Sequence, residues 1–571
     1  MSNNNKLKNM FIPTTKDEIN KLDWNSLDII LITGDTYIDS PFSGVALIGK
    51  ILIKADFKVG IIAQPELNSE KDICRLGEPD LFWGVTGGCI DSMVANKTAT
   101  LKKRKSDDYT PGGVNNKRPD RAVIQYTNLI KANFKNTAPI VLGGLEASLR
   151  RIAHYDLWSK KIRRSILFDS KADLLLYGMA DRSVVELANA LRDKKDPSSL
   201  RGLCYISNTP PADYLTLPDV QTTASDKDAF IEMFNIFYEN NDPQTAKGLK
   251  QKHDTRYLVQ TPPPSYLSID ELDDIYDTLD FEREVHPYYR KNGKTKALDT
   301  IRFSIATHRG CYGECNFCSI AVHQGRQIRW RSKDSIIKEA KKFTKHPLFK
   351  GIINNVGGPT ANMYGFECSK KIKEGACKNK RCIYPSICPS LNLDHSKYLE
   401  LLQEIRKIPG IKKVFVASGI RYDLLLADKN NVQNYIQEIV KYHTSGQLKI
   451  APEHSEKSVL DKMGKPSTES LLEFRKLFDQ INSKEAKKQF LTYYIIAAHP
   501  GCSKKDMHKL RNFLITKLKH IPQQVQVFTP TPSTYSTLMY YTEKDPFTKK
   551  SIFVEKNNNK KEKQKEILHK R

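Results

Sequence analysis

Three cysteines near the middle of the chain have the spacing Cys311-x3-Cys315-x2-Cys318. Thiolates at this spacing can come from one loop and bind three irons of a [4Fe-4S] cubane, whereas electron-transfer cubanes take four cysteines. The fourth iron then stays open and can chelate S-adenosylmethionine (SAM), whose sulfonium an electron cleaves to a carbon radical. A structural zinc site is the alternative, but zinc prefers four closed ligands, and the further donors nearby are His308 and His323. We therefore predict a SAM-binding iron–sulfur cluster on this loop.

The residues around the three cysteines resemble the signature of the radical SAM superfamily, in which an aromatic residue, here Phe317, precedes the third cysteine. The wider sequence is similar to the YgiQ-type branch of that superfamily, a group with no assigned substrate. The resemblance covers about residues 25–545 and is carried by residues 142–158, 170–173, 308–331, 357–364, 417–423, 448–454 and 525–541. It implies a [4Fe-4S] cluster held by Cys311, Cys315 and Cys318, and a 5′-deoxyadenosyl radical that abstracts a hydrogen from a substrate.

The same resemblance implies where SAM would bind. Gly357 and Gly358 follow the second expected barrel strand, where the superfamily has a Gly-Gly-Glu turn whose backbone receives the SAM amino group. Pro359 replaces the glutamate, a change that backbone recognition tolerates, and a plain strand-to-loop turn is the alternative. Further candidates for contacts with SAM or a substrate are Ser418, Arg421, Glu453, His454, the turn 497–501 and, for packing on adenine, Phe317. For each of these a structural role is open, although the planar fork of Arg421 suits a carboxylate.

Four further cysteines lie in an insertion after the second expected barrel strand, with the spacing C-x8-C-x4-C-x5-C: Cys368, Cys377, Cys382 and Cys388. Pro385, Pro389 and many lysines make the segment irregular, so it needs a cross-link such as a bound metal to be ordered. Four thiolates can bind an auxiliary [4Fe-4S] cluster or a zinc ion, and we place iron–sulfur slightly ahead of zinc. Unligated cysteines in a long loop are the remaining alternative.

The elements that must position these residues form a second α/β series after Asp299. Apolar strands are expected at 301–307, 351–356, 413–418, 448–451, 490–497 and 524–528. Helical patterns separate them at 333–344, 396–407, 432–443, 468–481 and 504–520. Six strand–helix units predict a partial (β/α)6 TIM barrel of radical SAM type over residues 298–542, with its chemistry at the carboxyl ends of the strands.

The first part of the chain, residues 1–195, alternates short apolar strands with helices and predicts an open, mainly parallel, Rossmann-like sheet. Glycine-containing turns at 34–35, 86–88 and 143–144 are expected at the carboxyl ends of its strands, where such sheets bind ligands. We predict that residues 196–297 form a connector that is interrupted by proline-rich stretches. Residues 543–571 read as a basic, disordered tail.

A polar stretch follows the turn at 143–144. Its charged residues are candidates for substrate contact or for docking onto the barrel, with an internal salt-bridge network as the equal alternative: Glu146, Arg150, Arg151 and His154. Domains of this kind ahead of a radical SAM barrel often resemble cobalamin-binding modules. The chain has no histidine before His154, which excludes a lower-axial histidine in the first half of the domain. Cobalamin bound without that ligand is the remaining alternative, and we expect the domain not to carry this cofactor.

The composition is that of a folded protein without an apolar run long enough to cross a membrane. The polar N-terminus lacks a signal-peptide core, and the clustered cysteines suit metal chemistry in the cytoplasm. A net charge of +26 leaves two alternatives open: an RNA-binding protein whose cysteines hold a structural metal, and a radical SAM enzyme that modifies RNA. The sequence contains no dedicated nucleic-acid motif that would support either one. We predict a cytoplasmic radical SAM enzyme of unknown substrate, with reduced flavodoxin or ferredoxin as its electron donor.

Overall fold

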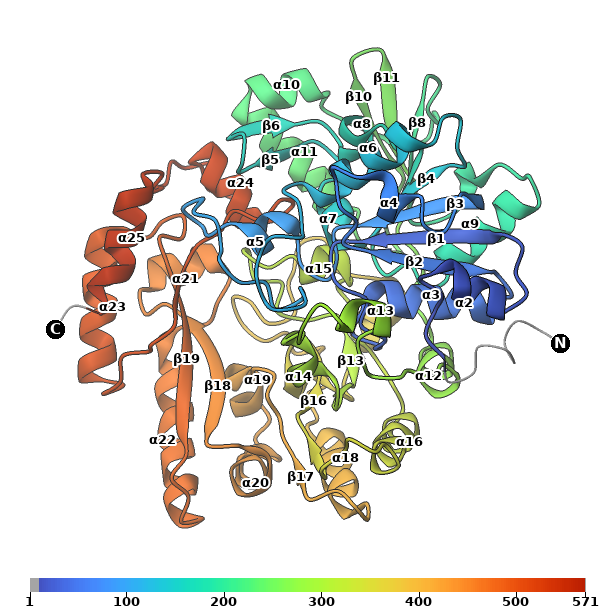
Figure 1. Cartoon of the computed structure of the whole chain (residues 1–571). Coiled ribbons are helices and arrows are strands. Elements are labelled where there is room, and N and C mark those ends of the chain that lie inside the picture. Colours follow the sequence, from blue (N-terminus) through green and yellow to red (C-terminus); the bar gives the residue numbers. More distant parts are fainter. Residues whose placement is uncertain (1–9, 570–571) are drawn as a thin grey trace. The chain divides into compact units, whose positions relative to one another are not determined.

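The computed structural model describes residues 10–569 of the chain. They form two compact units: the first runs up to Tyr266 and includes Asp274–Arg302, and the second consists of Leu267–Asp273 and the chain from Phe303 onward. Figure 1 labels the elements of both units. No helix within residues 10–569 is both long and apolar enough to cross a membrane.

The first unit is built on a nine-stranded sheet of order β2-β1-β3-β4-β7-β8-β11-β10-β9. Its parallel half comprises β1 (Leu27–Thr33), β2 (Val59–Ala63), β3 (Pro79–Thr86), β4 (Ile140–Leu142) and β7 (Leu174–Leu176). β1 and β2 are apolar almost throughout because both of their faces are buried. The chain passes from β1 to β2 on one side and returns to β3 on the other, so β1 and β3 form a topological switch point. The predicted Rossmann-like sheet is confirmed.

The other half of this sheet corrects our expectation of a connector at residues 196–297. That segment supplies β8 (Leu203–Ser207), β9 (Leu215–Leu217), β10 (Leu249–His253) and β11 (Arg256–Gln260). β8 pairs antiparallel with β7, and β10 and β11 form a hairpin through a two-residue turn in which Asp254 has a φ of +56°. These strands are short and carry polar residues, so their apolar pattern is weak. Pairing with an existing buried sheet stabilises them.

Helices and short elements complete the first unit. α2 (Lys16–Lys21) begins at a capping box, in which Thr15 and Glu18 each accept a backbone N–H from the other. The remaining elements are α3 (Gly44–Lys54), α4 (Glu70–Ile73), α5 (Ser92–Asn96), α6 (Ala122–Asn133), α7 (Gly144–Leu149), β5 (His154–Asp156), β6 (Lys161–Arg163), α8 (Ile166–Ser170), α9 (Ser183–Arg192), η1 (Pro197–Ser199), α10 (Val220–Ser225), α11 (Lys227–Glu239), α13 (Pro287–Arg290) and α14 (Ala297–Ile301). α12 (Ile269–Thr278) spans the boundary between the units along the chain.

The second unit repeats parallel strands and helices in chain order. Its barrel strands are β12 (Ser304–Ala306), β15 (Ile352–Ile353) with β16 (Asn355–Gly357), β17 (Lys413–Val414), β18 (Gln447–Glu453), β19 (Phe490–Ala497) and β20 (Val525–Val527). All the pairings among them are parallel, and a parallel bridge between Ile420 and Ile450 joins the third strand segment to β18. Six strand positions in this order agree with the predicted partial (β/α)6 barrel.

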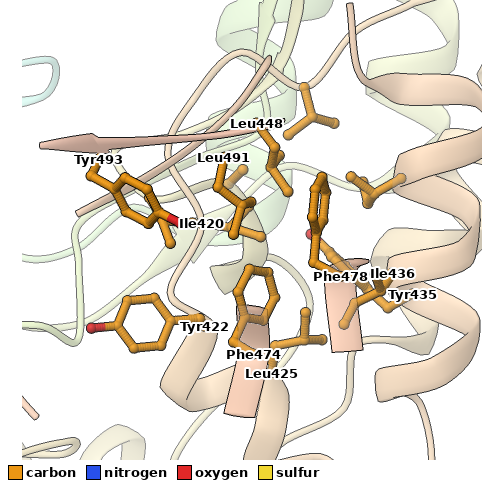
Figure 2. Close-up of a cluster of buried hydrophobic side chains, with 14 of the residues drawn as sticks. Ile420, Tyr422, Leu425, Tyr435, Ile436, Leu448, Phe474, Phe478, Leu491 and Tyr493 are labelled. Carbon is orange, nitrogen blue, oxygen red and sulfur yellow. The ribbon is translucent and has the colours of Figure 1, made fainter. Parts of the chain in front are cut away.

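Helices follow each barrel strand and cover it. They are α16 (Lys333–Thr344), α18 (Ser396–Lys407), α19 (Tyr422–Ala427), α20 (Val432–Glu438) with η3 (Ile439–His443), α21 (Lys457–Met463), α22 (Thr468–Lys484) and α23 (Lys504–Thr516). Figure 2 shows how side chains from β18 and β19 pack against α19, α20 and α22; among them are Leu448, Leu491, Tyr493, Leu425, Tyr435, Ile436, Phe474 and Phe478. This apolar layer fixes the strands whose carboxyl ends carry the candidate site.

The C-terminal residues correct a second expectation, that 543–571 form a disordered tail. α24 (Tyr535–Thr542) precedes this segment, and α25 (Asn558–Ile567) lies within it. Ile567 and Leu568 are buried in the core of the second unit, and the Ala498 N–H donates to Gln564 at 3.1 Å. The helix is mostly charged, so its sequence has little apolar periodicity. A few buried contacts on one face are enough to stabilise it because tertiary packing, rather than propensity, holds most helices.

Candidate functional site

The three signature cysteines lie on residues 311–318, which we call the cluster loop, between β13 (His308–Arg309) and α15 (Ile320–His323). Gly310 leads into this loop with a φ of +83°. A Cβ on Gly310 would lie 2.3 Å from the carbonyl oxygen of Gln327, so only glycine fits here. The Gly310 N–H donates to Oε1 of Gln324 at 3.0 Å. The loop therefore begins after β13 at a turn that any side chain would block.

The three thiols lie on one short loop, and Cys315 lies close enough to Cys311 and Cys318 to affect the pKa of both. Burial raises the pKa of Cys311, and the nearby Cys315 raises it further. The same two causes raise the pKa of Cys318 to about 12. A Cβ on Gly313 would lie 3.2 Å from Sγ of Cys311 and 3.6 Å from Sγ of Cys315, so the two sulfurs flank this glycine. A metal binds cysteines as thiolates, so ligation would have to offset these raised pKa values.

The donor set of the loop suits an iron–sulfur cubane better than a single ion. Across residues 10–569, no three or more His, Cys, Asp and Glu side chains are arranged to hold one metal ion. A cubane does not need such convergence, because each cysteine ligates a different iron. Three cysteines on one loop match the donor number of a [4Fe-4S] cluster with one open iron, and they are one donor short of the closed shell of structural zinc.

Arg421, which precedes α19, faces one of these cysteines. Its Nη1 lies 3.6 Å from Sγ of Cys315, while Nε and Nη2 donate to the carboxylate of Asp423 at 2.8 and 2.5 Å. Burial alone would lower the pKa of Arg421, but Asp423 and the nearby thiols raise it, so the guanidinium stays positive. Asp423 already occupies the bidentate side of the fork. The predicted contact between Arg421 and a SAM carboxylate would have to compete with it.

Ser418 is held by Asn355, a residue that the sequence reasoning missed. Asn355 Nδ2 donates to Ser418 Oγ at 2.9 Å, and its Oδ1 accepts the N–H groups of Ala417 and Ser418 at 2.8 and 2.9 Å. One amide on β16 thus fixes the turn after β17. The available signal was a pair of asparagines, Asn354 and Asn355, inside an otherwise apolar strand segment.

The glycine pair after β16 is closely approached by other residues. A Cβ on Gly357 would lie 3.1 Å from Ser418 Oγ, and one on Gly358 would lie 2.5 Å from Nε2 of His308. Burial lowers the pKa of His308 to about 4, so this imidazole is neutral at pH 7. The structure therefore brings the glycine turn next to Ser418 and to the strand that leads into the cluster loop.

β18 ends at Glu453, which has the left-handed backbone conformation with a φ of +68°, and His454 follows it. Such a φ is costly for a residue other than glycine and is often found at functional sites. Burial raises the pKa of the Glu453 carboxyl. His454 lies with Nε2 3.5 Å from Sγ of the buried Cys502. Phe317 packs partly buried against the core of the second unit, as its structural alternative requires.

The four-cysteine insertion, residues 368–388, packs beside the cluster loop. Cys368 and Cys382 are buried in one apolar cluster that also contains Tyr312 of the loop. Cys377 and Cys388 are half-buried, and the Cys388 N–H donates to the carbonyl of Cys382 at 2.8 Å. α17 (Ser369–Glu374) starts at Cys368, whose Sγ accepts the N–H of Lys371. The segment is thus ordered around its cysteines.

The polar stretch of the first unit forms internal networks. Arg150 pairs with Asp91, and Glu146 accepts the N–H of Ser92 at 3.0 Å. Arg151 is fully buried, donates to Gln260 and Asn241, and lies over the ring of Tyr177 at 4.3 Å. His154 is buried, which lowers its pKa to about 4. These contacts correspond to the internal-network alternative, all of them within the first unit.

Comparisons with protein families cover most of the chain. The model described as "Radical SAM N-terminal" matches residues 11–304, and that of the "Radical SAM superfamily" matches residues 305–514. A domain of unknown function, DUF3362, matches residues 523–571. The boundary between the first two models lies close to the boundary between the two compact units.

Curated relatives match over nearly their whole length. The UPF0313 protein of Fusobacterium nucleatum is 57% identical over 98% of both chains. That of Thermotoga neapolitana is 51% identical over 96% of both chains. That of Methanocella arvoryzae is 46% identical over 95% of this chain and 90% of its own.

Two solved structures share the fold at low sequence identity. The radical SAM methyltransferase TsrM from Kitasatospora setae, with cobalamin and a [4Fe-4S] cluster bound, has a TM-score of 0.50 at 12% identity, over 89% of this chain and 77% of that one. The cobalamin-dependent SAM radical enzyme OxsB, with aqua-cobalamin bound, has a TM-score of 0.51 at 11% identity, over 92% of this chain and 57% of that one. With the family models and the full-length relatives, the chain belongs to the UPF0313 family, the YgiQ-type branch of the radical SAM superfamily of iron–sulfur, SAM-dependent enzymes.

Proposed function

We propose that Cys311, Cys315 and Cys318 hold the [4Fe-4S] cluster through which this family acts on SAM. The observation that carries the proposal is the cluster loop, which gathers three thiols beside the positive charge of Arg421. When bound, the cluster and SAM supply a reductive cleavage that yields a 5′-deoxyadenosyl radical. Flavodoxin or ferredoxin is the proposed electron donor, and the cytoplasm the proposed location.

The chain's own residues would orient the reactants and exclude water. The Arg421 guanidinium, locked by Asp423, would offset negative charge on the thiolate of Cys315. The turn at Gly357 and Gly358 leaves backbone free of Cβ atoms next to the loop. We assign SAM contacts to this turn, to Ser418 as oriented by Asn355, and to Glu453, while Phe317 supports the loop from the core side.

Anaerobic reconstitution tests the proposal. Iron and sulfide are counted, and 5′-deoxyadenosine is measured after addition of SAM and a strong reductant. We expect an iron–sulfur chromophore and SAM cleavage that both require the three cysteines. Stoichiometric zinc without an iron–sulfur chromophore would overturn the assignment.

We also propose that the four-cysteine insertion binds metal, with iron–sulfur ahead of zinc. Support comes from Cys368 and Cys382, which share one buried cluster, and from Cys388, which is tied to Cys382 through its backbone. Replacing all four cysteines by alanine should lower the iron content by about one cubane while the SAM-responsive cluster remains. Unchanged metal content would refute this part alone.

Our expectation that the chain lacks cobalamin is not confirmed, since both solved neighbours carry it. We propose that the β1–β3 switch point does not take this cofactor. Arg118 fills that edge: it donates to the carbonyl of Gly87 at 2.6 Å, to Asp35 at 2.6 Å and to Asp107 at 3.1 Å, and its side chain is 0% exposed. After incubation with hydroxocobalamin and desalting, we expect no corrin absorbance. One corrin per chain would contradict the proposal.

A further inference from the structure

Two segments outside the barrel strands contact the cluster loop. One is the four-cysteine insertion, and the other is the C-terminal segment, residues 523–571, which the domain of unknown function matches. Both belong to the second compact unit, as does the loop. The loop itself has little regular structure, because only a two-residue strand and a four-residue helix flank it. Its shape must therefore be held by its neighbours.

Arg381, between the second and third cysteines of the insertion, joins all three segments. Its Nη1 donates to the carbonyl of Glu314 in the cluster loop at 3.1 Å. Its guanidinium lies over the rings of Tyr535 and Phe547 in the C-terminal segment, 5.4 and 5.6 Å from their centroids. The two rings contact each other at 4.9 Å. A guanidinium over aromatic faces gains electrostatic attraction while its N–H groups stay free to donate in its plane.

The insertion holds the loop a second time, through the side chain of Glu314. This carboxylate is buried, accepts from Nε of Arg326 at 2.9 Å and lies 3.7 Å from Nζ of Lys371. Arg326 donates in turn to the carbonyl of Cys377 at 2.9 Å, and Lys371 donates to the carbonyl of Arg326 at 2.6 Å. Glu314 has a φ of +42° and directly precedes Cys315. The network keeps this unfavourable backbone conformation in place.

The C-terminal segment holds the opposite neighbour of Cys315. The carbonyl of Asn316 accepts the N–H of Ser536 at 2.8 Å, in the first turn of α24, where helical N–H groups lack intrahelical partners. The N–H and Nδ2 of Asn316 donate to the carbonyls of Met463 and Lys462, both at 2.9 Å. Lys462 pairs with Asp545 of the C-terminal segment. Both residues adjacent to Cys315 are therefore fixed from outside the loop.

We propose that the C-terminal segment acts with the four-cysteine insertion as a clamp on the cluster loop, and that Arg381 is the positioning residue that couples them. The clamp sets the relative positions of the three thiols. This proposal rests on the proposed assignment of those thiols as cluster ligands, but it does not require the insertion to bind metal.

The test compares full-length anaerobic proteins after reconstitution. The variants are Arg381→Met, which removes the donor and the charge, and Arg381→Lys, which keeps a charge over the rings. Arg406→Met is the matched control, because Arg406 also lies over a ring, that of Tyr442 at 3.7 Å, and contacts Glu438, away from the loop. The readouts are the electron paramagnetic resonance spectrum of the reduced cluster with and without SAM, and the rate at which a chelator removes the SAM-responsive cluster.

We expect Arg381→Met to change the SAM-dependent spectrum and to speed cluster loss about tenfold, the effect of losing one desolvated cation–π contact with its hydrogen bond. Arg381→Lys should recover most of both, and Arg406→Met should match the wild type. Phe547→Ala changes a side chain that is 59% exposed, and it should shift both readouts in the same direction as Arg381→Met.

A wild-type spectrum and cluster lifetime in both Arg381→Met and Phe547→Ala would overturn the clamp. If Arg381→Met does not fold, a wild-type result for Phe547→Ala alone would overturn it. Failure of the cluster assignment is seen separately, because the wild-type protein itself would then show no SAM-responsive signal.

Discussion

The carboxyl ends of the parallel strands are used differently in the two units. In the first unit, the edge at β1 and β3 is filled by Arg118, whose N–H groups bind Asp35, Asp107 and the Gly87 carbonyl. In the second unit, the corresponding edge presents half-buried thiols and a glycine turn. The donors and acceptors of the ion-pair network bind one another, whereas the thiols of the second unit are free cysteines that can take a metal. We therefore propose that the same strand–helix architecture serves stability at this edge of the first unit and chemistry in the second.

The largest expected effect concerns the thiols of the second unit. Cys315→Ala removes one of three cluster ligands, so SAM cleavage should fall to background and the SAM-responsive signal should vanish. Iron content and 5′-deoxyadenosine formation are the measurements. Cys74→Ala, a half-buried free cysteine of the first unit, is the control and should leave both unchanged. Persistent cleavage in Cys315→Ala would remove the cluster assignment.

Arg118→Met removes the cation from the ion-pair network of the first unit. Asp35 and Asp107 would be left buried without their partner, which should lower the free energy of unfolding by about 3–5 kcal/mol. Urea denaturation measures this. The neighbouring Lys117→Met removes only an exposed pair with Glu66 and should cost about 0–1 kcal/mol. Equal effects of the two substitutions would show that the filled edge is not a stabilising network.

Asn355→Ala tests whether the turn at Ser418 in the second unit belongs to the SAM site. Loss of its three hydrogen bonds frees Ser418 and its turn, so we expect about 1–3 kcal/mol of destabilisation and SAM binding weakened about tenfold. Equilibrium binding of SAM to the oxidised cluster protein measures the second effect. Asn354→Ala, one residue earlier, keeps these bonds and serves as control. Unchanged SAM affinity in Asn355→Ala would separate Ser418 from the SAM site.

The smallest effect concerns acid stability and should be shared by both units. Burial would raise the pKa of Asp428, but hydrogen bonds from His395 and Asn431 lower it to about 2. A lowered pKa in the folded state adds stability above the unfolded value near 4, and this contribution is lost as the pH falls from about 4 to 2. Asp428→Asn should reduce the unfolding free energy that is lost over this pH range by about 1 kcal/mol.

Glu18 of the first unit is the counterpart, since burial opposes but His286 and the Thr14 N–H lower its pKa, also to about 2. Glu18→Gln should flatten the acid slope in the same pH window. Unfolding free energies measured between pH 2 and pH 6 test both. An acid slope unchanged by either substitution would exclude these pairs as its source.

Local patterns accounted for the regular parts of the fold. β1 and β19 were visible as apolar runs, and α16 and α23 as amphipathic periods, because burial imposes these patterns directly on the sequence. β10 and α25 were missed for the opposite reason. Each carries polar or charged residues on most of its surface and is stabilised by partners distant in the chain: β11 and β9 for the strand, and the turn at Ala498 for the helix.

The sequence by itself determined the superfamily, because the three-cysteine motif and the stretches around it are enough to identify a radical SAM protein, and it predicted a cubane with an open iron from the spacing of those cysteines. It also determined the two α/β series, through burial patterns that repeat along the chain. Only the tertiary structure decided what surrounds the cysteines. Asn355, Asp423 and Arg381 act on residues that are two to 166 positions away, and the hydrogen bonds and ring contacts that define their roles exist only after folding. Spacing can identify ligands on one loop, but the groups that hold that loop come from separate elements and leave no periodic signal.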